Sequence, residues 1–135
     1  MESTNRKASN MKKWLIASLF VIGLIGLDAH GQQAQTIGLI QFEELIADEK
    51  AQLLDVRTPN EFKEGTIPGA NNLDFYALDF QQSLTKLKKK DPVLVFCKSG
   101  GRSAKTMKML SDLGFKKVYD LKGGYNTYKA YRVEK

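Results

Sequence analysis

The chain has 135 residues, enough for one domain of ordinary size. It carries 21 basic and 15 acidic residues, which gives a formal net charge of +6. Four of the basic and two of the acidic residues lie in the first 31, so the remainder is only mildly basic. This balance suits small anions as ligands. It lacks the clustered basic face that nucleic acid requires, so we expect no nucleic-acid partner.

The N-terminal segment has the pattern of a targeting sequence. A pair of lysines precedes an apolar run over residues 14–27, which is too short to span a membrane comfortably. Small residues, Ala29 and Gly31, stand at the −3 and −1 positions if cleavage follows Gly31. We predict a signal peptide over residues 1–31 and a mature domain over residues 32–135 that is periplasmic or secreted. The alternative is an uncleaved segment that anchors the domain to the membrane.

The types of residue present exclude several kinds of site. The only histidine, His30, falls in the predicted signal peptide, so the mature domain would have no Cys–His pair and no Ser–His–Asp triad. The single cysteine, Cys97, excludes an intrachain disulfide and a C-x-x-C relay. One cysteine without a histidine is no metal-ligand set, so we expect no metal and no other cofactor.

From residue 35 onward, short apolar runs alternate with helical patterns. This alternation predicts an α/β domain with a mostly parallel sheet. We predict strands over residues 36–40, 52–56, 70–73, 93–96 and 118–121, and helices over residues 41–48, 75–87, 103–113 and 125–131.

One more short helix is predicted from its start signal. Thr58 and Glu61 have the spacing of a capping box, with Pro59 at the first helical position, and Gly65 ends the helix. A lysine-rich segment over residues 86–90 is the one dense basic patch. We interpret it as the solvated end of a helix that runs into a loop before Pro92.

Cys97 ends the most apolar predicted strand and begins a glycine-rich loop that leads directly into a helix. Ligands of parallel sheets bind beyond the carboxyl ends of the strands. Free N–H groups at a helix N-terminus favour negative charge and lower the pKa of a thiol. The sequence therefore predicts an anion-binding thiolate site. Its residues are Cys97, Lys98, Ser99, Gly100, Gly101, Arg102 and Ser103.

A set of short motifs follows in order along residues 35–133, and together they resemble a single-domain rhodanese, a sulfurtransferase. The resemblance implies a three-layer sandwich, with a mostly parallel five-stranded sheet and helices on both faces. The motifs are Leu54-Asp55-Val56-Arg57, Glu61-Phe62, Gly65-Thr66-Ile67-Pro68-Gly69-Ala70, Val95-Phe96-Cys97 with its loop, and Leu121-Lys122-Gly123-Gly124-Tyr125.

The resemblance also implies a reaction through a persulfide. The Cys97 thiolate would take sulfur from thiosulfate or another sulfane donor and pass it to cyanide or a thiol, including a thiol on a protein. The N–H groups of residues 98–103 would surround the terminal sulfur, and Gly100 and Gly101 would supply unusual backbone angles. Positive charge on Lys98 and Arg102 would attract an anionic donor.

Three residues outside the loop are candidates for lining or supporting the pocket. The resemblance implies a mainly structural role for Asp55, and for Arg57 either a pairing with an acid such as Glu61 or a place at the pocket. The alternative for Asp55 and Arg57 is a buried or rim salt bridge, and Glu61 is first a capping residue. Thr66 stands where many relatives have histidine, so any role of that histidine is unsupported here.

The length of the loop favours sulfur over phosphate. Four residues separate Cys97 from Arg102, whereas protein tyrosine phosphatases and the related cell-cycle phosphatases resemble one another in having five. A shorter loop makes a tighter cradle, better suited to sulfur than to tetrahedral phosphate. Two alternatives stay open: a rhodanese-like module that carries persulfide or docks a partner without turnover and, more distantly, a small cysteine phosphatase or arsenate reductase.

Overall fold

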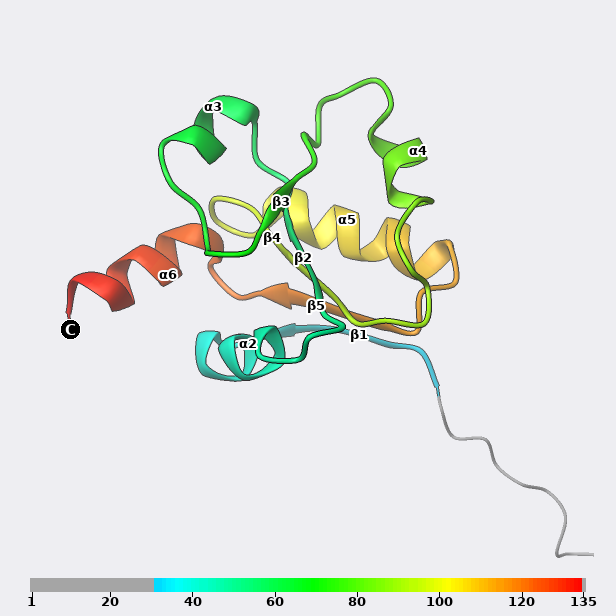
Figure 1. Cartoon of the computed structure of the whole chain (residues 1–135), viewed down its shortest axis with the longest axis horizontal. Coiled ribbons are helices and arrows are strands. Elements are labelled where there is room, and N and C mark those ends of the chain that lie inside the picture. The colour runs from blue at the N-terminus through cyan, green and yellow to red at the C-terminus, as the bar shows by residue number, and fades with distance from the viewer. Residues whose placement is uncertain (1–30, 135) are drawn as a thin grey trace, which may run out of the picture.

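A parallel five-stranded sheet organises residues 31–134, the part of the chain that this computed structural model describes (Figure 1). The order across the sheet is β1-β5-β4-β2-β3, and each strand runs parallel to its neighbours. This confirms the predicted fold class and places the most apolar strand at the centre. The strands are β1 (Gln33–Ile37), β2 (Gln52–Asp55), β3 (Asn71–Asn72), β4 (Val93–Phe96) and β5 (Lys117–Leu121).

Helices cover both faces of the sheet and give the expected three layers (Figure 1). Helices α4 and α5 pack on one face, and α2 and α6 pack on the other. The short helix α3 follows β2. The helices are α2 (Leu39–Ile46), α3 (Pro59–Lys63), α4 (Phe80–Leu84), α5 (Gly101–Asp112) and α6 (Gly124–Val133).

Strand β4 is fully buried because its side chains pack into both helical layers. Val93 and Val95 join the core beneath α4 and α5, whereas Leu94 and Phe96 join the core beneath α2 and α6. Burying each of these side chains stabilises the fold by about 1.5–3 kcal/mol. Because alternate side chains of β4 are buried on opposite faces of the sheet, the strand is held in position along its whole length. Cys97 directly follows its carboxyl end.

Two predicted elements differ from the structure most in their bounds. The helix expected over residues 75–87 shrinks to α4, because the Asp74 side chain accepts a hydrogen bond from the Tyr76 N–H at 3.0 Å and holds a turn there. The first strand lies three residues earlier than predicted, at Gln33–Ile37 instead of residues 36–40, and residues 39 and 40 belong to α2. It starts at Gln33 on an exposed edge, where backbone pairing with β5 needs no apolar side chain.

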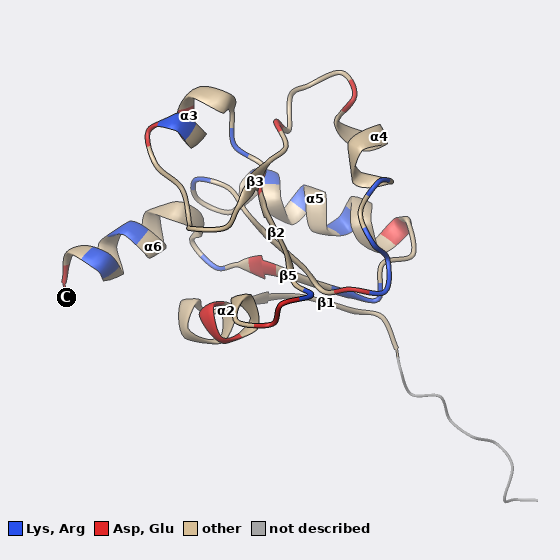
Figure 2. Cartoon of the chain, in the orientation of Figure 1, with Lys and Arg blue, Asp and Glu red and all other residues tan. Residues whose placement is uncertain are grey.

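The remaining local predictions concern α3 and the charged surface. The capping box is present, with the Thr58 hydroxyl accepting from the Glu61 N–H and the Glu61 carboxylate accepting from the Thr58 N–H. The lysines of residues 86–90 lie exposed in turns between α4 and β4. Figure 2 shows basic residues also on α3, α5 and α6, so they are distributed over several elements.

The predicted signal peptide lies outside the described residues, apart from Gly31. Within residues 31–134, no helix is both long enough and apolar enough to cross a bilayer.

Candidate active site

The sulfur of Cys97 lies between the carboxyl end of β4 and the first turn of α5. The residue is 1% exposed and belongs to the core beneath α4 and α5. Two donors point at Sγ: the Gly100 N–H at 3.1 Å and the Ser103 hydroxyl at 3.3 Å. Of the loop residues that the sequence singled out, Gly100 and Ser103 therefore form hydrogen bonds with the sulfur.

The conformation of the loop depends on one of its two glycines. Gly100 has φ of 117°, in the left-handed region that favours glycine, and this angle turns its N–H toward Cys97. Gly101 was expected to share this role, but its φ is not in that region, and it begins α5. Arg102 and Ser103 consequently lie on the first helical turn, and the helix begins two residues earlier than predicted.

The surroundings of Cys97 shift its ionisation in two opposing ways. Burial raises the pKa of the thiol, whereas the Ser103 hydroxyl and the nearby N–H groups of Ser103, Gly100 and Ser99 lower it. The effect of these donors prevails, so the pKa of Cys97 lies below its ordinary value. A thiolate is the nucleophilic form of cysteine, and here it is stabilised without a general base.

Two backbone hydrogen bonds join the start of α6 to the Cys97 loop. The Tyr125 N–H donates to the Cys97 carbonyl at 2.8 Å, and the Asn126 N–H donates to the Lys98 carbonyl at 3.0 Å. Gly124 makes this approach possible, since a Cβ at that position would lie 2.5 Å from the Cys97 carbonyl oxygen. The sequence singled out the Gly123-Gly124 pair only as part of the motif over residues 121–125 and did not predict this contact with the loop.

Arg102 is held by a carboxylate from another helix. Its guanidinium forms two hydrogen bonds with Glu61 of α3, at 2.8 and 2.9 Å. The hydrogen bond from Arg102 is the main cause that lowers the pKa of Glu61 to about 2. Glu61 raises the pKa of Arg102 in return, and the Cys97 thiolate adds to that effect. Arg102 is therefore a positioned cation whose charge is largely matched by Glu61.

Arg57 pairs with an acidic residue, and that residue is Asp55 instead of Glu61, the example that the resemblance suggested. Both residues are buried, at 4% and 0% exposure, and Arg57 Nη2 lies 2.6 Å from Asp55 Oδ2. The same guanidinium donates to the Gly65 carbonyl at 2.7 Å, and Thr66 Oγ1 donates to Asp55 Oδ2 at 2.8 Å. This is the buried salt bridge that was the alternative for Asp55 and Arg57. Thr66 supplies a hydrogen bond from the position where relatives often have histidine.

A hollow of about 160 Å³ lies beside the loop, against the start of α6. In it, the Arg57 guanidinium sits 4.1 Å from the centre of the Tyr125 ring, a cation–π contact. Arg57 therefore also borders a pocket, as expected, and exposed Lys98 contributes positive charge there. The lining residues are Arg57, Glu61, Glu64, Lys98, Tyr125, Asn126 and Lys129.

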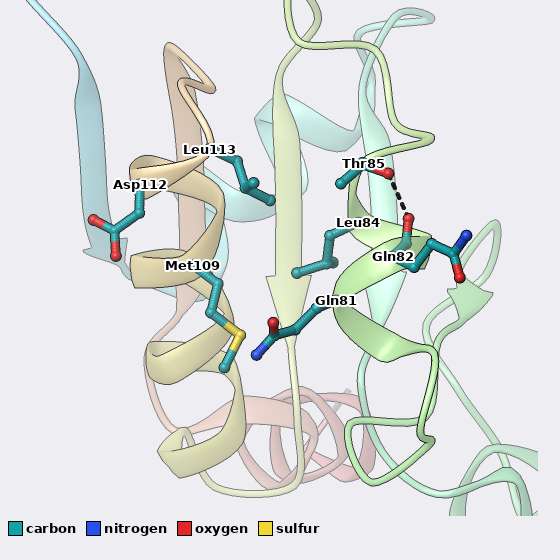
Figure 3. Close-up of a pocket in the computed structure, with 7 residues that line it drawn as sticks. All are labelled: Gln81, Gln82, Leu84, Thr85, Met109, Asp112 and Leu113. Carbon is teal, nitrogen blue, oxygen red and sulfur yellow. Dashed lines mark hydrogen bonds between the residues drawn. The ribbon is translucent and has the colours of Figure 1, made fainter.

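A second hollow, of about 460 Å³, lies between α4 and α5 and contains no residue of the Cys97 loop. Figure 3 shows Met109 of α5 and Leu113, which directly follows α5, facing Gln81 and Leu84 of α4 across it. Its one ionisable group is Asp112, which pairs with Lys108 at 2.8 Å. A hollow without a nucleophile offers no site for thiol chemistry, although it is the more spacious of the two. Within residues 31–134, no group of three or more His, Cys, Asp or Glu side chains could hold a metal ion.

This fold and this cysteine loop define a rhodanese-like domain. The family model for that domain matches residues 39–131, and the chain belongs to this family.

Sulfurtransferases are among its relatives. The thiosulfate sulfurtransferase GlpE of Coxiella burnetii is 36% identical over 88 residues, which cover 65% of this chain and 80% of GlpE. The uncharacterized protein YqhL of Bacillus subtilis is 34% identical over 121 residues, covering 89% of this chain and 93% of YqhL. The structure of the human single-domain sulfurtransferase TSTD1 matches with a TM-score of 0.64 and 26% identity, covering 73% of this chain and 97% of TSTD1.

Proposed function

We propose that this protein is a sulfurtransferase that carries sulfane sulfur as a persulfide on Cys97. The observation that carries the proposal is the pair of donors on Sγ, the Gly100 N–H at 3.1 Å and the Ser103 hydroxyl at 3.3 Å. Together with the start of α5, they stabilise a negative sulfur. Such a site supports both the attacking thiolate and the persulfide that follows.

The reaction balances without an added oxidant or reductant. The Cys97 thiolate attacks the outer sulfur of thiosulfate, a new S–S bond forms, and the old S–S bond breaks as sulfite leaves with the electron pair. An acceptor such as cyanide or a thiolate then attacks the outer sulfur of the persulfide. The bond to Sγ breaks, and the thiolate of Cys97 is restored.

Thiosulfate is proposed as the donor on two grounds. Exposed Lys98 beside the loop and the net positive charge of the chain favour a small anion. The relative GlpE is named a thiosulfate sulfurtransferase. We also propose that the protein works in the periplasm or outside the cell, on the evidence of the N-terminal pattern. Fractionation of the native host with an antibody to the domain tests that proposal separately.

The first test is the intact mass of the purified domain before and after thiosulfate. We expect a gain of one sulfur atom that is lost on adding cyanide, and no gain in Cys97→Ser. Serine fits the same volume, so this variant should fold and give the matched control. A folded wild-type protein that gains no sulfur from thiosulfate or from another sulfane donor would contradict the proposal and favour a binding module.

A further inference from the structure

A loop beside the sulfur site exposes two large side chains to solvent. Residues 73–79, called here the rim loop, connect β3 to α4 and project from the body of the domain (Figure 1). On this loop Tyr76 is 67% exposed and Leu78 is fully exposed. Single exposed apolar side chains are ordinary on a protein surface, whereas two on one short loop favour an interaction surface.

The rim loop contacts both the arginine and the core of the sulfur site. The guanidinium of Arg102 lies 5.8 Å from the centre of the Tyr76 ring, a cation–π contact. The neighbouring Phe75 packs against the core cluster that contains Cys97. Its N–H donates to the carbonyl of Val56, another member of that cluster, at 3.3 Å. The exposed side chains therefore lie next to the Cys97 loop.

Local contacts fix the shape of the rim loop. The Asp74 carboxylate accepts the Tyr76 N–H at 3.0 Å, and the Asp74 carbonyl accepts the Ala77 N–H at 3.0 Å. The Phe80 N–H then donates to the Ala77 carbonyl at 3.1 Å. The rings of Phe75 and Tyr76 meet edge to face, with their centres 5.4 Å apart. A loop that is already ordered loses little entropy when a partner docks on it.

The charge of the rim loop does not suit the proposed donor. Asp74 and Asp79 are its acidic residues, and residues 71–85 contain no lysine, arginine or histidine. Figure 2 shows this acidic segment between β3 and α4. Both aspartates line one hollow of about 190 Å³ beside α4. Negative charge disfavours an anion such as thiosulfate and favours a cationic group, so the rim loop is a surface for the other substrate, the acceptor.

The position of Cys97 limits how a protein acceptor can approach. Cys97 is 1% exposed, and a cysteine sulfur is joined to its own backbone through a single CH₂ group. A protein thiol that takes sulfur from Cys97 must therefore bring its backbone close to the Cys97 loop. The residues beside that thiol then meet the rim loop, where Tyr76 and Leu78 offer apolar contacts and Asp79 offers a negative charge.

We propose that the rim loop is the docking surface for a protein acceptor whose cysteine is flanked by an apolar and a basic side chain. The apolar side chain would pack on Tyr76 and Leu78, and the basic one would lie against the two aspartates of the loop. The inference rests on the proposed sulfur transfer and names the class of its acceptor.

The test measures how fast Cys97 reacts with short peptides that carry their cysteine as a mixed disulfide with thionitrobenzoate. The Cys97 thiolate attacks the peptide sulfur and a new S–S bond forms. The bond to thionitrobenzoate breaks, and that thiolate leaves with the electron pair, so its absorbance gives the rate. The exchange needs no sulfane sulfur, so its failure is distinct from a failure of the chain to form persulfide.

Three peptides, blocked at both ends, separate the apolar contact from the charge: Lys-Leu-Cys, Lys-Ser-Cys and Glu-Leu-Cys. We expect the wild type to react with Lys-Leu-Cys roughly three- to tenfold faster than with either of the others. In Leu78→Ser, the advantage over Lys-Ser-Cys should disappear. In Asp79→Asn, the advantage over Glu-Leu-Cys should shrink. Both residues are exposed, so both variants should fold.

Ile40→Ser is the matched control, because Ile40 is 57% exposed on α2, which packs on the opposite face of the sheet from α4. It should keep all three rates. Equal rates for the three peptides, no exchange with any of them, or unchanged preferences in Leu78→Ser would overturn the proposal. Sedimentation tests the other possible occupant: a dimer that Leu78→Ser dissociates would show that a second copy covers the rim loop and would also overturn it.

Discussion

Arg102 and Glu61 join the sulfur-site loop to α3 through two parallel hydrogen bonds of 2.8 and 2.9 Å. The same Glu61 carboxylate accepts the Thr58 N–H at 2.9 Å and so also closes the capping box of α3. One side chain therefore fixes both the start of a helix and the orientation of the arginine that closes the loop. A planar guanidinium suits this fork better than a lysine would.

Replacing Glu61 should change how stability depends on pH. Its pKa of about 2 in the folded protein lies below the ordinary value of 4.5. The carboxylate therefore stabilises the fold above about pH 4.5, and this contribution is lost as the pH falls toward 2. We expect Glu61→Gln to lose about 1–2 kcal/mol at neutral pH. Urea unfolding measured across the acid range should show a flatter profile in the variant.

Glu64→Gln is the matched control for that change. Glu64 lies exposed at the end of the same helix and lines the same hollow. We expect a change within about 0.5 kcal/mol and an acid profile like that of the wild type. Equal profiles for Glu61→Gln and the wild type would show that the ion pair with Arg102 contributes nothing measurable.

Strands that are buried on both faces were predictable from the sequence, and the exposed edge was not. Continuous apolar runs mark β4 and much of β2 because helices cover both sides of them. Strand β1 begins with Gln33-Ala34-Gln35, whose side chains are exposed, so its pairing with β5 rests on backbone groups that leave no pattern in the side chains.

The site was predictable where it is local in sequence. The sulfur and its two donors lie within seven consecutive residues, so the Cys97 loop could be found from spacing alone. The partners of the two arginines could not be found in this way. Asp55 and Glu61 are both close to Arg57 in sequence, so spacing does not decide between them. In the folded chain, Arg57 pairs with Asp55, whereas Glu61 pairs with Arg102, 41 residues away.

Thr66 should contribute to stability through the buried salt bridge. Its hydroxyl donates to Asp55 Oδ2 at 2.8 Å, and Asp55 is fully buried. Thr66→Val keeps the size of the side chain but removes this donor, which should cost about 1–3 kcal/mol in the free energy of unfolding. The measurement is urea unfolding with an unchanged m-value.

Thr85→Val is the control, because it removes a hydroxyl that is hydrogen-bonded on the exposed surface. Its free energy of unfolding should stay within about 0.5 kcal/mol of the wild type. Similar losses in the two variants would remove the argument for Thr66.

Gly124 should tolerate no side chain. Its φ is +60°, and a Cβ would lie 2.5 Å from the carbonyl oxygen of Cys97 and 2.7 Å from that of Lys98. Gly124→Ala must therefore push α6 away from the loop, which breaks the hydrogen bond from the Tyr125 N–H to Cys97. We expect a loss of more than about 2 kcal/mol in unfolding free energy, together with slower persulfide formation from thiosulfate.

Gly114→Ala separates backbone strain from this close approach. Gly114 has φ of +90°, but a Cβ there would meet nothing within 4 Å. The variant should lose only the strain energy, about 1–2 kcal/mol, and form persulfide at the wild-type rate. If both variants lost persulfide formation equally, general destabilisation would explain the result. The claim that contacts with α6 position the Cys97 loop would then be disproved.

Lengthening the loop by one residue should damage the sulfur site more than the fold. A glycine inserted between Gly100 and Gly101 moves the start of α5 relative to Cys97, so the Gly100 N–H and the Ser103 hydroxyl can no longer both reach Sγ. Loss of one such donor, about 1–1.5 kcal/mol, should slow persulfide formation about tenfold, measured by intact mass against time.

A glycine inserted between Lys90 and Asp91, in the turn before β4, is the control and should leave the rate unchanged. Wild-type persulfide formation by the longer loop would disprove the argument from loop length. Hydrolysis of an aryl phosphate by the unaltered chain would favour the phosphatase alternative instead.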